Sequence, residues 1–350
     1  MKLKGELLDV WFTKNATKPK ELGSKIGDEY IAQYNKVASD LQKYVHSETT
    51  KGAISIDGGY LTDHGPDHIG TVIARASALV EAESCLLSAY EVYLLLMAIH
   101  FHDIGNVFGR ANHASNAQEA MKWLGESAGR DEFEKKMILQ IARAHGGEID
   151  GDKDTIGKLG VNAPLHNRQV RPRLLAAILR FADELADERR RANRFGLDTK
   201  SIPETAAIYH EYALALHSVR IEHEGQTTEL AFSVPHDKAL RKYKLDGGES
   251  YLLDYILKRT LKMYLEQMYC MRYMRNSIAL DRIDVRIEVF GDAIDPIETI
   301  AYRIAESGYP TVPLEIYELC PDLAKHAAWG DVRVCGESLH SRLSGGTQRD

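Results

Sequence analysis

The chain lacks the features of exported, membrane-bound or disordered proteins. Its four cysteines lie far apart and form no Cys-x-x-Cys pair, which argues against a disulfide framework or a thiolate zinc site: Cys85, Cys270, Cys320 and Cys335. The apolar run from Val92 to Ile99 is far shorter than a membrane span, and no apolar segment follows Lys4 as in a signal peptide. Ten prolines and 27 glycines are too few for a low-complexity chain. We therefore expect a soluble, cytoplasmic protein without a membrane partner.

The chain also lacks a strong excess of charge of either sign. The 44 basic and 51 acidic residues give a net charge of -7, which argues against a protein whose whole surface binds nucleic acid but leaves room for a local basic groove. Hydrophobic residues make up 44% of the chain, as in globular proteins, and 350 residues are enough for two domains.

The apolar pattern divides the chain into four predicted parts. Residues 1–58 are predicted to form an N-terminal helical leader with one helix over 28–45. Residues 59–200 are almost wholly helical in pattern, with a uniformly apolar and therefore central helix around 92–99. Residues 205–330 are expected to form a smaller α+β domain, and residues 331–350, rich in Ser and Gly, a flexible tail.

Local signals place further elements within these parts. Ser115 and Gln118 form a capping-box pattern that starts a helix, and two more helices are predicted over 131–145 and 172–193. In the α+β part the predicted strands are 212–222, 228–234 and 282–290, in a mostly antiparallel sheet. Its predicted helices are 252–276 and 296–306.

Histidines gather in the helical region, and two of them face its core. Seven of the fourteen histidines lie between residues 60 and 170. At 100° per residue, His68 shares a helix face with Val72 and Leu79. His145 shares a face with Ile141 on another helix. Imidazoles from two helices are therefore expected to enter one core.

Two carboxylates have a similar setting. The doublet His102-Asp103 directly follows the apolar helix, and Asp183 lies at the rim of an apolar helix face. Taken singly, an inward histidine is often a hydrogen-bonded core residue, and a rim aspartate is often solvated or paired with arginine. Together these groups are most simply neutralised by a metal ion, because a buried unpaired carboxylate is costly. Imidazole and carboxylate without thiolate suit Mn, Fe, Zn, Co or Mg.

Three segments resemble the HD-domain phosphohydrolase superfamily. They are His68-Ile69-Gly70-Thr71-Val72, His102-Asp103-Ile104-Gly105, and Leu179-Arg180-Phe181-Ala182-Asp183-Glu184-Leu185. They follow the family order of a helical histidine, a His-Asp doublet and a late aspartate, within residues 60–195. The resemblance implies a mainly α, HD-domain-like helical bundle followed by the smaller α+β domain. It also implies that His68, His102, Asp103 and Asp183 hold one divalent metal.

The resemblance extends to further residues. His113 and His145 fall where six-ligand members place extra histidines, which implies a second ion bridged by Asp103 and a hydroxide held between the two. His64, one turn before His68, fits an outer ligand, a proton donor or a helix-start residue, of which the last two fit better. Asn106 departs from the pattern, because many two-metal members have a lysine after the doublet.

Arginines offer a substitute for that missing cation. Residues 168–194 hold eight arginines against four acids. Guanidinium groups suit phosphate oxygens, although a solvated helix end also favours positive charge. On the wheel Arg180 and Asp187 lie near Asp183, so they are the candidates for phosphate contact and for support of the site; Arg110 and Arg143 are further candidates.

These observations predict a metal-dependent phosphohydrolase or phosphodiesterase that uses metal-activated water on a nucleotide or related phosphoester, with one or two ions as cofactor. Two alternatives stay open. One is an HD-type nuclease on single-stranded DNA or RNA, with the arginines along its backbone. The other is a non-catalytic nucleotide-sensing or scaffold module, motivated by Asn106. Homo-oligomerisation through the edge of strand 282–290 is a further open point.

Overall fold

The computed structural model describes residues 3–18, 24–46, 65–105, 113–149, 151–245, 247–306 and 315–345. The chain forms two compact units. The first comprises Met1–Gly59, Asp63–Ala186 and Tyr269–Ala279; the second comprises Tyr60–Thr62, Asp187–Met268 and Leu280–Asp350. A boundary between the two units thus falls between Ala186 and Asp187, inside the region predicted as one domain over 59–200. A mainly α part with a smaller α+β part is confirmed.

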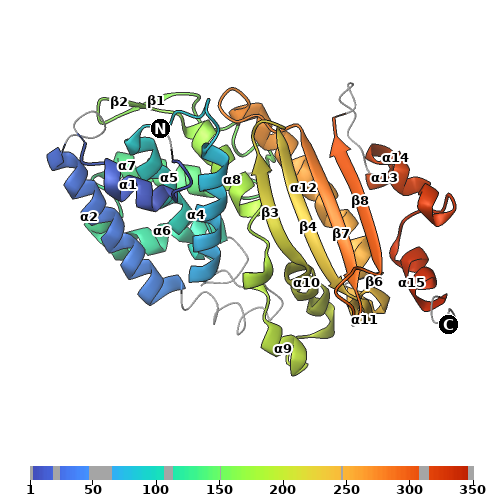
Figure 1. The fold of residues 1–350 in the computed structure, drawn as a ribbon. Helices are drawn as coiled ribbons and strands as arrows, with labels where there is room; N and C mark the ends of the chain where they lie inside the picture. Colours follow the sequence, from blue (N-terminus) through green and yellow to red (C-terminus); the bar gives the residue numbers. More distant parts are fainter. Residues whose placement is uncertain are drawn as a thin grey trace. The chain divides into compact units, whose positions relative to one another are not determined.

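The first unit is helical apart from one short hairpin. Its helices are α1 (Leu8–Asn15), α2 (Ser24–Leu41), a π-helical turn (Gln42–His46), α4 (Pro66–Val80), α5 (Ala89–Phe101), α6 (His113–Leu124), a 3-10 turn (Gly125–Ala128), α7 (Glu132–Arg143) and α8 (Pro172–Glu184). Its hairpin pairs β1 (Ala163–Leu165) with β2 (Arg168–Val170) in antiparallel register. Figure 1 shows the helices of this unit grouped around α5.

Helix α5 is the centre of this unit, as its apolar sequence predicts. Every residue from Ala89 to Phe101 is buried, and the helix packs against α1, α2, α4, α7 and α8. Its start is fixed by a capping box, in which Ser88 Oγ accepts from the backbone N–H of Glu91 (3.2 Å) and Glu91 Oε2 accepts from the N–H of Ser88 (3.0 Å). Arg171 donates to both carboxylate oxygens of Glu91, at 2.8 Å each. The buried acid is therefore fully paired.

One helix of this region is shorter than predicted. The helix expected over 172–193 ends at Glu184, where the N–H of Leu185 bonds to the carbonyl of Phe181. Asn193 starts the next helix instead of ending this one, because its side chain accepts from the N–H of Gly196 at 2.8 Å. The predicted helix over 131–145 is confirmed as α7, capped by Asp131.

The second unit combines a sheet with helices. Its helices are α9 (Arg194–Asp198), α10 (Glu204–Ala215), α11 (His236–Leu240), most of α12 (Leu252–Met274), α13 (Ile316–Leu319), α14 (Pro321–Ala324) and α15 (Gly336–Gly345), with 3-10 turns at Arg189–Arg191 and Ala327–Trp329. Its strands are β3 (Leu216–Glu222), β4 (Thr227–Pro235), β5 (Lys242–Leu245), β6 (Gly248–Tyr251), β7 (Arg282–Phe290) and β8 (Glu298–Ala305).

The main sheet has the strand order β3-β4-β7-β8 and is mixed. The pairs β3/β4 and β7/β8 are antiparallel, while β4 and β7 run parallel. Alternate residues such as Phe232 and Ile287 are buried on one face, where Thr228 bonds to Gln267 of α12 and Tyr302 bonds to Thr260 of α12. Helix α12 lies behind the strands in Figure 1. One face of the sheet therefore belongs to the core of this unit.

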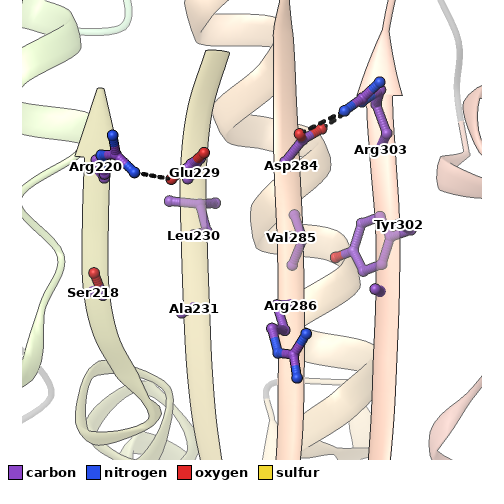
Figure 2. Close-up of a pocket in the computed structure, with 11 residues that line it drawn as sticks. Ser218, Arg220, Glu229, Leu230, Ala231, Asp284, Val285, Arg286, Tyr302 and Arg303 are labelled. Atoms are coloured by element: carbon purple, nitrogen blue, oxygen red, sulfur yellow. Dashed lines mark hydrogen bonds and ion pairs between the residues drawn. The ribbon is translucent and has the colours of Figure 1, made fainter. Parts of the chain in front are cut away.

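The opposite face of the sheet carries charged side chains around a hollow of about 580 Å³. Figure 2 shows Arg220 beside Glu229 and Asp284 beside Arg303 on neighbouring strands. Arg286 pairs with Glu288 at 2.7 Å. These cross-strand and same-strand ion pairs are typical of a solvated sheet face, where each contributes little to stability. The hollow shares no residue with the His/Asp cluster described below.

Three predictions for the second unit are wrong. The segment predicted as a helix over 296–306 is strand β8, because Ile300, Tyr302 and Ile304 alternate into the core. The predicted strand over 212–222 begins only at Leu216, since the residues before it end the alanine-rich α10. The expected flexible tail contains α15, which buries Leu339. The strand predicted over 282–290 is confirmed. None of the helices that the structure describes has the length and apolar character needed to cross a bilayer.

Candidate metal centre

Three helix ends in the first unit bring four side chains together. His68 lies in the first turn of α4, which begins with Pro66; His102 caps the end of α5, and Asp103 follows it. Asp183 lies in the last turn of α8. Because α4 packs against both α5 and α8, these positions meet at one place. The structure thus brings together the four residues that resemble the HD ligand set.

The donor atoms of the cluster are closely spaced. The Nε2 atoms of His68 and His102 are 3.4 Å apart. Asp183 Oδ1 lies 3.2 Å from His68 Nε2 and 3.5 Å from His102 Nε2. Asp103 Oδ2 lies 3.6 Å and 3.4 Å from the same two atoms. Four ligands at about 2.1 Å from one tetrahedral ion would be about 3.4 Å apart, so the spacing fits a single divalent cation.

Burial and charge make this arrangement unusual for an ordinary core. The side chains of His68 and His102 are fully buried, and that of Asp183 is 25% exposed, which leaves one open side. Burial raises the pKa of Asp103, but His102, His145 and His68 outweigh it and hold that pKa well below its usual value. Burial likewise raises the pKa of Asp183, and hydrogen bonds from His102 and His68 outweigh it. Both carboxylates are therefore ionised near neutral pH, the form in which a carboxylate can bind a cation.

A backbone hydrogen bond sets the orientation of His102. Its Nδ1 donates to the carbonyl of Ile99 at 2.7 Å, so Nε2 is the nitrogen that points to the cluster. Such a bond fixes the tautomer and the ring plane of a metal-ligating imidazole. Two imidazoles and two carboxylates without a thiolate are a donor set for Mn, Fe, Zn, Co or Mg, and the residues present fit such an ion.

His145 adds a fifth side chain to this centre. Its Nδ1 donates to the carbonyl of Ala142 at 2.5 Å, and its Nε2 lies 3.4 Å from Asp103 Oδ1. The two oxygens of Asp103 thus face different partners, with Oδ2 toward His68 and His102 and Oδ1 toward His145.

The structure does not describe the side chains of four other predicted site residues. His64, Asn106 and Arg110 lie outside the described residues. His113 is the first residue of α6, but its side chain is not among those described. Their proposed roles stay predictions.

Arg180 and Asp187 are separated from each other by the end of α8. Arg180 is 9% exposed and donates from Nη1 to the carbonyl of Gly146 (2.8 Å) and to Thr155 Oγ1 (3.0 Å). Asp187 lies past the helix, in the second unit, where it pairs with Arg191 and Arg259. The wheel that placed them together assumed a longer helix.

Most of the other arginines of 168–194 are also bound within their own unit. Arg171 bonds to Glu91 and to the carbonyl of Leu86, and Arg173 donates to the carbonyls of Leu159 and Gly157. Arg190 and Arg194 pair with neighbouring acids. These side chains stabilise loops and helix ends, and they do not form one continuous row of cations.

Two buried histidines beside the centre were not singled out from the sequence as site residues. His46, in the π-helical turn, and His100, in α5, have ring centroids 5.8 Å apart. Burial lowers the pKa of His46 to about 3 and that of His100 to about 4, so both rings are neutral. His46 Nε2 and both nitrogens of His100 have no hydrogen-bond partner among the described residues. In the sequence, His46 directly follows the predicted helix 28–45, and His100 directly follows the apolar run 92–99.

A basic groove runs between α6 and α7. It encloses about 510 Å³ and is lined by Lys122, Lys135, Lys136 and Arg143, with Met121 and Leu139 among its apolar residues. Glu132 is the acid that lines it, and it pairs with Lys135. The lining charge is therefore about +3 on a chain whose net charge is -7.

Comparison with known proteins gives one match. The family model described as HD-CE matches residues 58–262, more than half of the 350 residues. The matched region contains all four residues of the His/Asp cluster, and His145 as well. Neither a curated protein nor a solved structure matches the chain.

Proposed function

The chain belongs to the HD-CE family, and on this premise we propose that it is a metal-dependent phosphohydrolase with an HD-type helical bundle, acting on a nucleotide or related phosphoester. The observation that carries the proposal is the convergence of His68, His102, Asp103 and Asp183, whose donor atoms lie within 4.8 Å of one another. Two imidazole nitrogens and two carboxylates that converge on one point form a donor set that a divalent cation would neutralise, because buried carboxylates need a nearby positive charge.

The residues have distinct roles in this proposal. His68, His102, Asp103 and Asp183 hold one divalent cation, and His145 with Asp103 Oδ1 offers part of a second position. When bound, the cation supplies a hydroxide near neutral pH and neutralises phosphoryl oxygens. The hydrogen bonds from His102 to Ile99 and from His145 to Ala142 keep both Nε2 atoms available as ligands. The partly exposed Asp183 marks the side from which a phosphoester can approach.

The test combines metal content with turnover. Protein purified without chelator is expected to hold one or two divalent ions per chain by elemental analysis. With added Mn²⁺ it is expected to hydrolyse a chromogenic phosphoester or one of a panel of mono-, di- and cyclic nucleotides. Asp103→Asn is expected to lower turnover by at least about a hundredfold, because it removes a ligand charge without changing side-chain volume.

The matched control is Asp198→Asn, an exposed aspartate of the second unit that pairs with Arg194 at 3.9 Å. This variant is expected to keep wild-type activity. A folded, metal-loaded protein that leaves the whole panel and short oligonucleotides uncleaved would overturn the proposal and favour the nucleotide-sensing or scaffold alternative.

The α6–α7 groove favours a second candidate, a nuclease on single-stranded DNA or RNA. Its cations suit a polyanionic backbone, and the apolar side chains of Met121 and Leu139 in its lining suit bases. In this case affinity for a fluorescent single strand falls steeply with salt, and Lys136→Gln reduces the slope of that dependence by about one. A mononucleotide enzyme shows neither effect.

A further inference from the structure

We propose that Thr155 and Arg180 are positioning residues for His145, and that they set the affinity of the centre for its cation by fixing the backbone on both sides of that imidazole. The inference rests on the proposed function insofar as His145 is taken as a ligand. It gives Arg180 a different role from the phosphate contact that the sequence suggested.

The end of α7 creates the need for such residues. The last carbonyls of a helix have no partner within the helix, and His145 follows the final turn of α7. Thr155 Oγ1 donates to the carbonyl of Ala144 at 2.7 Å, and Arg180 Nη1 donates to the carbonyl of Gly146 at 2.8 Å. The residues before and after His145 are therefore each held by a side chain. A guanidinium at this end also suits the negative pole of the helix.

The two positioning residues are joined and supported. Arg180 Nη1 also donates to Thr155 Oγ1 at 3.0 Å, and Thr155 is completely buried. The guanidinium carbon of Arg180 lies over the ring of Tyr269, 4.6 Å from the ring centroid. The hydroxyl of Tyr269 accepts from the N–H of Ile156 (3.0 Å) and donates to Asp154 (2.9 Å). The turn that carries Thr155 is thus held in place on both sides of that residue.

The consequence for the metal centre is geometric. Because the carbonyls of Ala144 and Gly146 are held, the backbone of His145 is fixed. The hydrogen bond from its Nδ1 to the carbonyl of Ala142 then fixes the rotation of the imidazole. Its Nε2 then faces Asp103 Oδ1 at 3.4 Å. Loss of the Thr155 hydroxyl frees the carbonyl of Ala144, so the imidazole must be ordered again when the cation binds. Loss of such supporting bonds typically costs 10- to 100-fold in metal affinity.

The main test measures Mn²⁺ affinity directly, with no assay of turnover. Thr155→Val is expected to weaken Mn²⁺ binding about tenfold, whereas Thr155→Ser, which keeps the hydroxyl, restores it to within about twofold. The Co²⁺ absorption spectrum of Thr155→Val is expected to shift toward that of His145→Ala. Arg180→Lys, which keeps the charge but loses the forked geometry, is expected to act in the same direction.

A double-mutant cycle shows whether the effect passes through His145. In a His145→Ala background, Thr155→Val is expected to have no further effect on Mn²⁺ affinity, because the residue it positions is gone. The control is Thr260→Val, another fully buried threonine, which bonds to carbonyls of its own helix in the second unit. It is expected to lower stability without changing Mn²⁺ affinity or the Co²⁺ spectrum.

The outcomes separate this inference from the proposed function. Additive effects of the two substitutions, or a Thr155→Val protein with wild-type affinity and spectrum, would overturn the positioning role while leaving the four-residue centre intact. An unchanged affinity in His145→Ala would overturn it as well. A wild-type chain that binds neither Mn²⁺ nor Co²⁺ would overturn both. An effect of Arg180→Lys on KM alone would return Arg180 to the role of a phosphate contact.

Discussion

At the scale of single residues, the buried imidazole of His46 lies beside the centre, and its burial makes protonation unfavourable. His46 is 2% exposed and faces His100, with His102, His68 and Asp103 close enough to affect its charge. Burial, followed by the repulsion from His100, lowers its pKa from 6.5 to about 3. In the unfolded chain the same ring would titrate near 6.5, so the unfolded state binds more protons between the two values.

This difference predicts an acid-sensitive contribution to stability. The contribution is complete above pH 6.5 and is lost as the pH falls from 6.5 toward 3. Between pH 7 and pH 5, His46 alone is expected to lower the unfolding free energy of the metal-free protein by about 2 kcal/mol. Denaturant unfolding at both pH values measures it. In His46→Phe the loss should be smaller by this amount, and an identical loss in both proteins would contradict the prediction.

At the scale of elements, the central helix α5 depends on its first turn. All of its residues are buried, so its position relative to α4 and α8 sets where His102 and Asp103 meet the other ligands. The capping box of Ser88 and Glu91 satisfies backbone donors at the helix start that have no partner within the helix.

Ser88→Ala is therefore expected to lower the unfolding free energy by about 1 kcal/mol, measured by denaturant unfolding. The control is Ser341→Ala on α15, where an exposed hydroxyl bonds, among the described residues, only to the carbonyl of Glu337. A change within about 0.5 kcal/mol is expected there. Equal effects of the two substitutions would show that the capping box does not support α5.

At the scale of the whole molecule, metal binding and folding stability are linked. A cation that binds only the folded chain adds about 2.7 kcal/mol to the unfolding free energy at 100 times its Kd. Mn²⁺ is therefore expected to raise the melting temperature of chelator-treated protein. Most of this gain should disappear in Asp183→Asn, which removes one charge from the cluster.

The control for this measurement is Asp284→Asn, which removes a carboxylate paired with Arg303 on the sheet of the second unit. It should keep the full response to Mn²⁺. A response that survives in Asp183→Asn but is lost in Asp284→Asn would place the bound ion elsewhere.

Much of the fold follows from local pattern. Helix α5 was predictable because its sequence is uniformly apolar, and helix α7 and strand β7 were predictable because their apolar residues repeat with a single period. Strand β8 was predicted as a helix although Ile300, Tyr302 and Ile304 repeat with the two-residue period of a strand, so that prediction missed a signal that the sequence contains. By contrast, α15 owes its order to burial of Leu339 and not to its Ser- and Gly-rich composition.

The candidate site, too, was only partly predictable from the sequence. By itself the sequence determined which four residues make up the candidate centre, His68, His102, Asp103 and Asp183, because their residue types, their order and their helix positions are local properties that resemble one family. Only the tertiary structure decided what surrounds them. Arg180 and Thr155 meet at the end of α7 although 25 residues separate them, and His46 reaches the buried ring of His100 from a distant helical turn. Such partners are chosen by packing of distant segments and by unpaired carbonyls at a helix end, neither of which leaves a period in the sequence.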